Sequence, residues 1–141
     1  MKNSKLLKVT GNLMIIAGTI VILLGIISMF VEGLFAAAGA SVGIEWTIAI
    51  LGMLGGVAEF VAGIFGVKSW KKPEKAAKCI VLGVIVLVLI AASQILSLMQ
   101  SLILDASTVF TLGNVATWLV GFVVPVLYLF GAAHLSEQAK K

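Results

Sequence analysis

The sequence is short of the residue types that support a soluble enzyme, a disulfide-bonded fold or a metal centre. It has one cysteine, one histidine, two prolines and no arginine in 141 residues, and charged residues make up only 11% of the chain. A single cysteine excludes a disulfide scaffold, and so few histidines and cysteines leave no set of metal ligands. No phosphate-binding glycine loop or nucleophile–base pair is visible. We therefore expect neither catalysis nor a cofactor.

Apolar residues are what the chain has in abundance. They make up 61% of it, and the mean hydropathy is +1.19, whereas a typical soluble domain is about 45–50% apolar and roughly 25% charged. A chain of 14.7 kDa cannot bury this much apolar surface in water, and it is far too hydrophobic to be disordered. The composition predicts one integral membrane domain over residues 1–141.

Four apolar runs are long enough to cross a bilayer, which takes about 20 residues in a helix. They predict an all-α bundle of four transmembrane helices at about 9–31, 46–67, 78–103 and 112–133. The first run exceeds the roughly 7–15 apolar residues of a signal peptide, so we interpret it as a permanent helix. The segment 33–45 is either a short interfacial helix or an ordered cap, and the sequence leaves this open.

The lysines determine the predicted orientation. With four spans, all ten lie on one side of the membrane: Lys2, Lys5, Lys8, Lys68, Lys71, Lys72, Lys75, Lys78, Lys140 and Lys141. The opposite loops hold Glu32, Glu45 and Asp105 and no lysine. Because cytoplasmic loops collect basic residues, we expect both termini in the cytoplasm and a multi-pass protein of the cytoplasmic membrane. The use of lysine without arginine is typical of an AT-rich bacterial genome.

The loop between the second and third spans is a candidate for binding anionic lipid headgroups. Its positive charges are Lys68, Lys71, Lys72, Lys75 and Lys78, and each lysine near a membrane surface adds about 1 kcal/mol of attraction. The alternative is that they only fix the topology. Basic and aromatic residues do not alternate as they do on a nucleic-acid surface, so no nucleic acid is expected as a partner.

Glycines at regular spacing predict how the helices pack. Helices in lipid associate through small residues that let their backbones approach closely. Glycines recur every seven residues in the first span, and the second span has a GxxxG pair and a seven-residue repeat through Glu59. We expect the two spans to form an antiparallel hairpin along these positions: Gly11, Gly18, Gly25, Gly52, Gly56, Gly63 and Gly66. The alternative is that glycine is simply commoner in membrane helices.

Glu59 is the one ionisable side chain that we place inside the hydrocarbon. Trp46 and Trp70 are 24 residues apart, about 36 Å along a helix, which matches two aromatic anchors at opposite interfaces. Glu59 lies next to their midpoint. A charge at that depth costs about 2.5–3.5 kcal/mol on insertion scales, and no lysine is available to pair with it.

Polar groups on other spans are candidate partners for a neutral, protonated Glu59. Pro125 cannot donate to the carbonyl four residues earlier, that of Gly121, which leaves an acceptor near the membrane centre. Thr19 and Gln94 are further polar partners at similar depth, and Asn114 is another candidate polar partner.

Two functions are compatible with these features. The first is an interaction or scaffold role, as an accessory subunit of a membrane-protein partner or as a homo-oligomer, packed through glycine-rich helix faces. The alternative is a small proton- or cation-coupled transporter or channel that uses Glu59; a membrane-permeabilising protein is a weaker third option. The chain resembles small multidrug exporters in its four spans and single membrane acid, although their acid lies in the first helix. It also resembles rotor-ring subunits in placing a glycine-rich helix before an acid-bearing one, but it lacks their alternating glycines.

The predicted orientation can be checked with single cysteines in a Cys79→Ser background. Lys141→Cys should stay unlabelled when intact cells are treated with a membrane-impermeant maleimide, whereas Ala37→Cys, on the opposite side, should be labelled. Labelling of Lys141→Cys from outside intact cells would contradict an even number of crossings with both ends in the cytoplasm.

Overall fold

The computed structural model describes residues 4–39, 43–104 and 112–138. Within these ranges the chain forms four α-helices and no strand: α1 (Ser4–Ala37), α2 (Gly43–Ser69), α3 (Ala76–Leu104) and α4 (Leu112–Gln138), with a short 3-10 turn η1 (Pro73–Lys75). The prediction of an all-α helical bundle is confirmed. Four of the charged residues used to predict the orientation lie outside the described residues: Lys2, Asp105, Lys140 and Lys141.

Three helical stretches are long and apolar enough to cross a membrane: 5–37, 43–69 and 73–103. Large apolar side chains point away from the bundle along these helices; Phe30 is 71% exposed and Ile103 76%. Such a surface is stable in lipid and not in water. The chain is therefore a multi-pass membrane protein, and the crossing by α4 remains a prediction, because several of its side chains lie outside the described part.

The first two helices are longer than their apolar runs. Helix α1 continues past the predicted boundary at 31 to Ala37, and α2 begins at Gly43, so most of the segment 33–45 extends these two helices. A turn follows α1, in which Gly39 has φ of 87°, a conformation that glycine adopts without strain. At the other end of α2, Pro73 begins η1, a position that suits a residue without an N–H.

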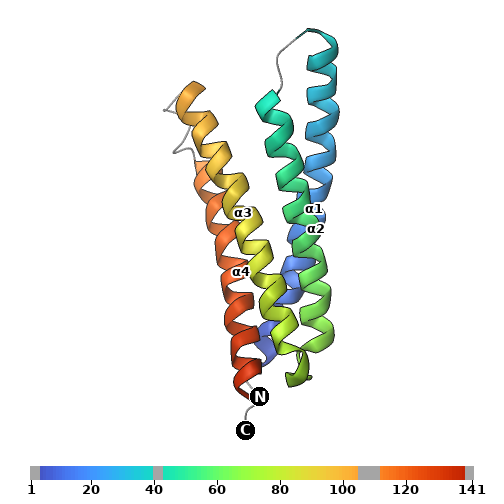
Figure 1. Cartoon of the computed structure of the whole chain (residues 1–141), viewed down its shortest axis with the longest axis vertical. Helices are drawn as coiled ribbons and strands as arrows, with labels where there is room; N and C mark the ends of the chain where they lie inside the picture. The colour runs from blue at the N-terminus through green and yellow to red at the C-terminus, as the bar shows by residue number, and fades with distance from the viewer. Residues whose placement is uncertain (1–3, 40–42, 105–111, 139–141) are drawn as a thin grey trace.

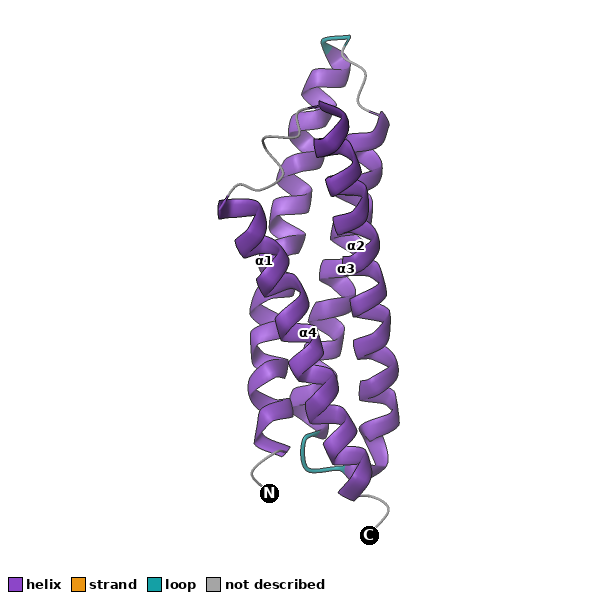
Figure 2. Ribbon diagram, turned by 90° about the vertical axis from the view of Figure 1, so that its left-hand side faces the viewer, coloured by secondary structure: helices purple, strands orange, loops and turns teal. Residues whose placement is uncertain are grey.

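The helices run up and down (Figure 1), and α1 packs most extensively against α2, whereas α3 packs against both α2 and α4. We refer to α1 with α2 and to α3 with α4 as the two helix pairs. Both chain ends and the turn between α2 and α3 lie at one end of the bundle, which we call the lysine-rich end. The opposite end, where α1 ends and α2 begins, is the distal end. The two pairs lie close together at the lysine-rich end and diverge toward the distal end (Figure 1). Figure 2, turned by 90°, shows all four helices running along the same long axis.

Two reciprocal pairs of glycines bring α1 and α2 into backbone contact. A Cβ atom added to Gly18 would lie 2.6 Å from the Gly56 carbonyl oxygen, and one added to Gly56 would lie 3.2 Å from that of Gly18. Seven residues along each helix, a Cβ on Gly63 would lie 2.6 Å from the Gly11 oxygen, and one on Gly11 would lie 3.0 Å from that of Gly63. The structure thus contains an antiparallel glycine hairpin.

The other glycines of α2 do not face a glycine of α1. A Cβ on Gly66 would meet the ring of Tyr128 on α4 at 2.5 Å, whereas one on Gly52 would have no atom within 4 Å. Gly25 of α1 faces the side chain of Met53 rather than a second glycine. The repeat through Gly52, Glu59 and Gly66 is therefore not part of the contact with α1, because it lies on the face of α2 turned toward the rest of the bundle.

All four helices meet in an apolar core near the lysine-rich end. Tyr128 of α4 is fully buried there, and its hydroxyl donates a hydrogen bond to the Ala62 carbonyl of α2 at 2.8 Å. Backbone contact also joins α4 to α1, since a Cβ on Gly131 would lie 2.9 Å from the Leu7 nitrogen. The core residues include Leu7, Met14, Ala62, Cys79, Val86, Tyr128, Ala132 and Leu135. This end of the bundle is therefore closed.

The glycine contact predicts a position-dependent effect of added methyl groups. Gly18→Ala should lower the free energy of unfolding by about 1–3 kcal/mol, because the new methyl group meets the rigid backbone of α2. Gly33→Ala in the same helix has no atom within 4 Å of its added Cβ, and it should be neutral or slightly stabilising. Thermal unfolding of both variants in the same detergent measures the difference, and equal midpoints would contradict the contact.

Candidate functional site

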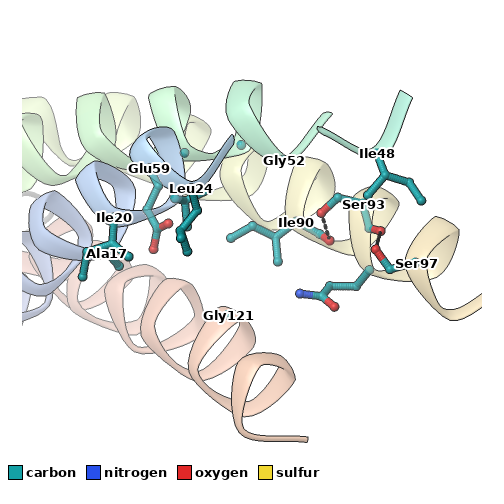
Figure 3. A pocket seen from close by; sticks show the side chains of 14 residues that line it. Ala17, Ile20, Leu24, Ile48, Gly52, Glu59, Ile90, Ser93, Ser97 and Gly121 are labelled. Atoms are coloured by element: carbon teal, nitrogen blue, oxygen red, sulfur yellow. Dashed lines mark hydrogen bonds between the residues drawn. The ribbon is translucent and has the colours of Figure 1, made fainter. Parts of the chain in front are cut away.

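A cavity of about 540 Å³ lies between the two helix pairs, and Glu59 extends from α2 into it (Figure 3). The Glu59 side chain is almost completely buried, with 4% of the residue exposed. Every helix contributes to the wall. The lining residues are Ala17, Ile20, Val21, Leu24, Ile48, Gly52, Gly55, Gly56, Glu59, Ile90, Ser93, Gln94, Ser97 and Gly121.

Small residues create the space around Glu59. Gly55 and Gly52 stand about one and two helical turns from Glu59 toward the distal end of α2, and neither has a side chain to fill the gap. Ala17 on α1 and Gly121 on α4 are the facing residues. Because the helix pairs also diverge toward the distal end, no larger side chain from α3 or α4 takes up this volume. The cavity therefore follows directly from the composition of its walls.

Few polar groups in the wall have hydrogen-bonding capacity left over. The Ser93 hydroxyl donates to the Ile90 carbonyl at 2.9 Å, and the Ser97 hydroxyl donates to the Ser93 carbonyl at 3.0 Å, as Figure 3 shows. Both hydroxyl protons are therefore used within α3. Within the described residues, the Gln94 amide and the Glu59 carboxyl group have no hydrogen-bond partner. These two groups are the ones available to a ligand.

The structure brings some of the predicted partners of Glu59 together and leaves others apart. Gln94 and Gly121 line the same cavity, and the Gln94 amide nitrogen would be 3.8 Å from a Cβ on Gly121. Thr19 does not reach the cavity: it is exposed, and its hydroxyl donates to the Ile15 carbonyl at 2.7 Å. No hydrogen bond joins Glu59 to the Gly121 carbonyl among the described residues. Asn114 belongs to α4, but its side chain lies outside the described part.

The cavity is open sideways and bridged at its distal end. Ile20 and Leu24 belong to its wall, yet 50% and 57% of these residues remain exposed, so the wall formed by α1 borders the surrounding lipid. Beyond the cavity, the Gln100 side-chain amide of α3 donates to the Glu45 carboxylate of α2 at 2.9 Å. Glu45 was expected in a loop, and this bridge was not predicted.

The predicted lipid-binding lysines lie away from the cavity. They are exposed and belong to the lysine-rich end: Lys68, Lys71, Lys72, Lys75 and Lys78. Two contacts there were not predicted: the Lys8 and Lys71 ammonium groups both lie over the Trp70 ring. Among the described residues, no group of three His, Cys, Asp or Glu side chains could hold a metal ion. Among the described residues, the polar groups of the cavity wall are the Glu59 carboxyl group, the Gln94 amide and two serine hydroxyls, in otherwise apolar surroundings.

Comparison with known protein families, with curated proteins and with solved structures finds no match to this chain.

The bridge at the distal end can be measured by a double-mutant cycle. Each single variant, Glu45→Ala or Gln100→Ala, should lower the free energy of unfolding. The double variant should lower it by less than the sum of the two single effects. The coupling energy should be about 0.6 kcal/mol, the average for hydrogen bonds between membrane helices. Ser101→Ala is a suitable control, because its hydroxyl bonds only within α3. Strict additivity of Glu45→Ala and Gln100→Ala in thermal unfolding would contradict the bridge.

Proposed function

We propose that the protein binds an apolar molecule carrying one positive charge in the cavity beside Glu59, in exchange for the proton of Glu59, as a small transporter of the cytoplasmic membrane. The observation that carries the proposal is the position of Glu59: an almost fully buried residue whose carboxyl group opens into a cavity and has no hydrogen-bond partner among the described residues. An ionisable group at this depth is expensive, and such groups mark substrate and ion pathways in membrane proteins.

The size and polarity of the cavity support a ligand of this kind. Ligand pockets are typically about 300–1,000 Å³, mostly apolar, with a few polar groups that fix orientation; this cavity is about 540 Å³. An empty cavity leaves Glu59 without a counter-ion, which favours the protonated form. A bound cation acts as the counter-ion of the Glu59 carboxylate, and the proton of Glu59 is released. One positive charge therefore enters the cavity as another leaves it.

The contacts of the glycines within the chain favour ligand binding in the cavity over a role as an accessory subunit or homo-oligomer. Most of the glycines through which a homo-oligomer or accessory subunit was expected to pack are occupied inside the chain, and Gly52 borders the cavity. Gly11 and Gly18 contact Gly63 and Gly56, and Gly66 contacts Tyr128. An interaction role would need another surface. We propose no catalytic role for any residue.

A pair of probes of similar shape and opposite charge tests the role of Glu59. Purified protein should bind tetraphenylphosphonium in preference to tetraphenylborate, with release of one proton per cation in weakly buffered solution. Glu59→Gln keeps the shape of the side chain and removes its charge, and it should weaken phosphonium binding by at least about tenfold, because a buried charge loses its partner.

Glu74→Gln is the matched control, because Glu74 is exposed in η1 and should not affect binding. Equal phosphonium affinity in wild type and Glu59→Gln, or equal preference for the two probes, would overturn the proposal. Unchanged thermal unfolding of Glu59→Gln in the absence of ligand would show that the loss of binding does not come from misfolding.

A further inference from the structure

A second cluster of charged and aromatic side chains lies at the lysine-rich end, away from the cavity. Trp70 directly follows α2, and its side chain packs against the apolar core at that end. The Lys8 ammonium group of α1 lies 5.3 Å from the centre of its ring, and the Lys71 ammonium group lies 4.7 Å from it. A fixed indole thus holds two cations that come from different segments of the chain.

The two positive charges are close together and unneutralised by the described residues. With distances of 5.3 and 4.7 Å to one ring centre, the two nitrogens are at most 10.0 Å apart. This is within about one Debye length in dilute salt, so they repel each other. Among the described residues no acid pairs with either lysine; the one ion pair there joins His134 and Glu137. An anion bound by both lysines would remove the repulsion.

The position of the cluster identifies the source of that anion. Helix α2 has 27 residues, which gives a length of about 40 Å, close to the roughly 40–45 Å thickness of a bilayer with its headgroups. Trp70 at its end therefore lies at headgroup depth, where tryptophan is enriched in membrane proteins. The anions concentrated at that depth are lipid phosphates.

We propose that Lys8, Lys71 and Trp70 form a binding site for the phosphate of an anionic phospholipid. The two ammonium groups donate hydrogen bonds to the phosphate oxygens, and the indole fixes the lysines beside the lipid. The bound lipid links α1 to the turn between α2 and α3. The site is independent of Glu59 and of the function proposed for the cavity.

Matched lysine variants separate this site from diffuse attraction by all the lysines. Protein in an uncharged detergent is titrated with phosphatidylglycerol, and binding is followed by native mass spectrometry and thermal unfolding. Wild type should bind the lipid and unfold at a higher temperature, whereas phosphatidylcholine should have little effect. Lys8→Gln and Lys71→Gln should each weaken phosphatidylglycerol binding about fivefold. Lys5→Gln and Lys75→Gln remove equally exposed charges that do not contact Trp70 and should change it little.

Three results would overturn the proposal. Equal losses in all four lysine variants would mean diffuse attraction without a site. An equal thermal shift with inorganic phosphate at the same concentration would mean a site for free phosphate instead of lipid. If phosphatidylglycerol neither bound to wild type nor changed its unfolding temperature, the protein would have no site for this lipid. Because all four lysines are exposed, their replacement should leave the fold intact, and unfolding without lipid checks this.

Discussion

The backbone contact between α1 and α2 is the interaction on which the rest of the bundle depends. In lipid, helices gain nothing from removing apolar side chains from water, so they associate through close packing. The backbones of α1 and α2 approach each other's carbonyl oxygens at two glycine pairs, Gly18 with Gly56 and Gly11 with Gly63. This geometry also permits weak Cα–H···O contacts. This hairpin provides the surface that α3 and α4 join, and they join it most closely at the lysine-rich end.

The cavity lies where the close packing of the four helices ends. Where Gly66 and Gly131 meet Tyr128 and Leu7, the four helices close completely; where Gly52 meets nothing, they do not. Glu59 lies at the transition between the two regions, with its carboxyl group on the open side (Figure 3). In the described part of the chain, the Glu59 carboxyl group faces the cavity and not a hydrogen-bonding partner. Its position favours a role toward something that enters the cavity.

The spans and the hairpin could be predicted from the sequence because both depend on spacing along the chain. The direction in which a side chain points depends on the rotation of its helix. Thr19 follows Gly18 directly, and one step of about 100° turns it away from α2. On α2, two seven-residue repeats coexist, and spacing alone cannot decide that Gly56 and Gly63 meet α1. The bridge between Glu45 and Gln100 escaped prediction because α2 begins before its apolar run.

The two ends of the bundle are held together with very different strength. The lysine-rich end has an apolar core, a buried hydrogen bond from Tyr128 and close backbone contacts between helices. Toward the distal end, the hydrogen bond from Gln100 to Glu45 is the one side-chain bond between the two helix pairs among the described residues. Glu59 lies between the closed end and the opening. The separation of the helices at this point therefore sets the width of the cavity beside its carboxyl group.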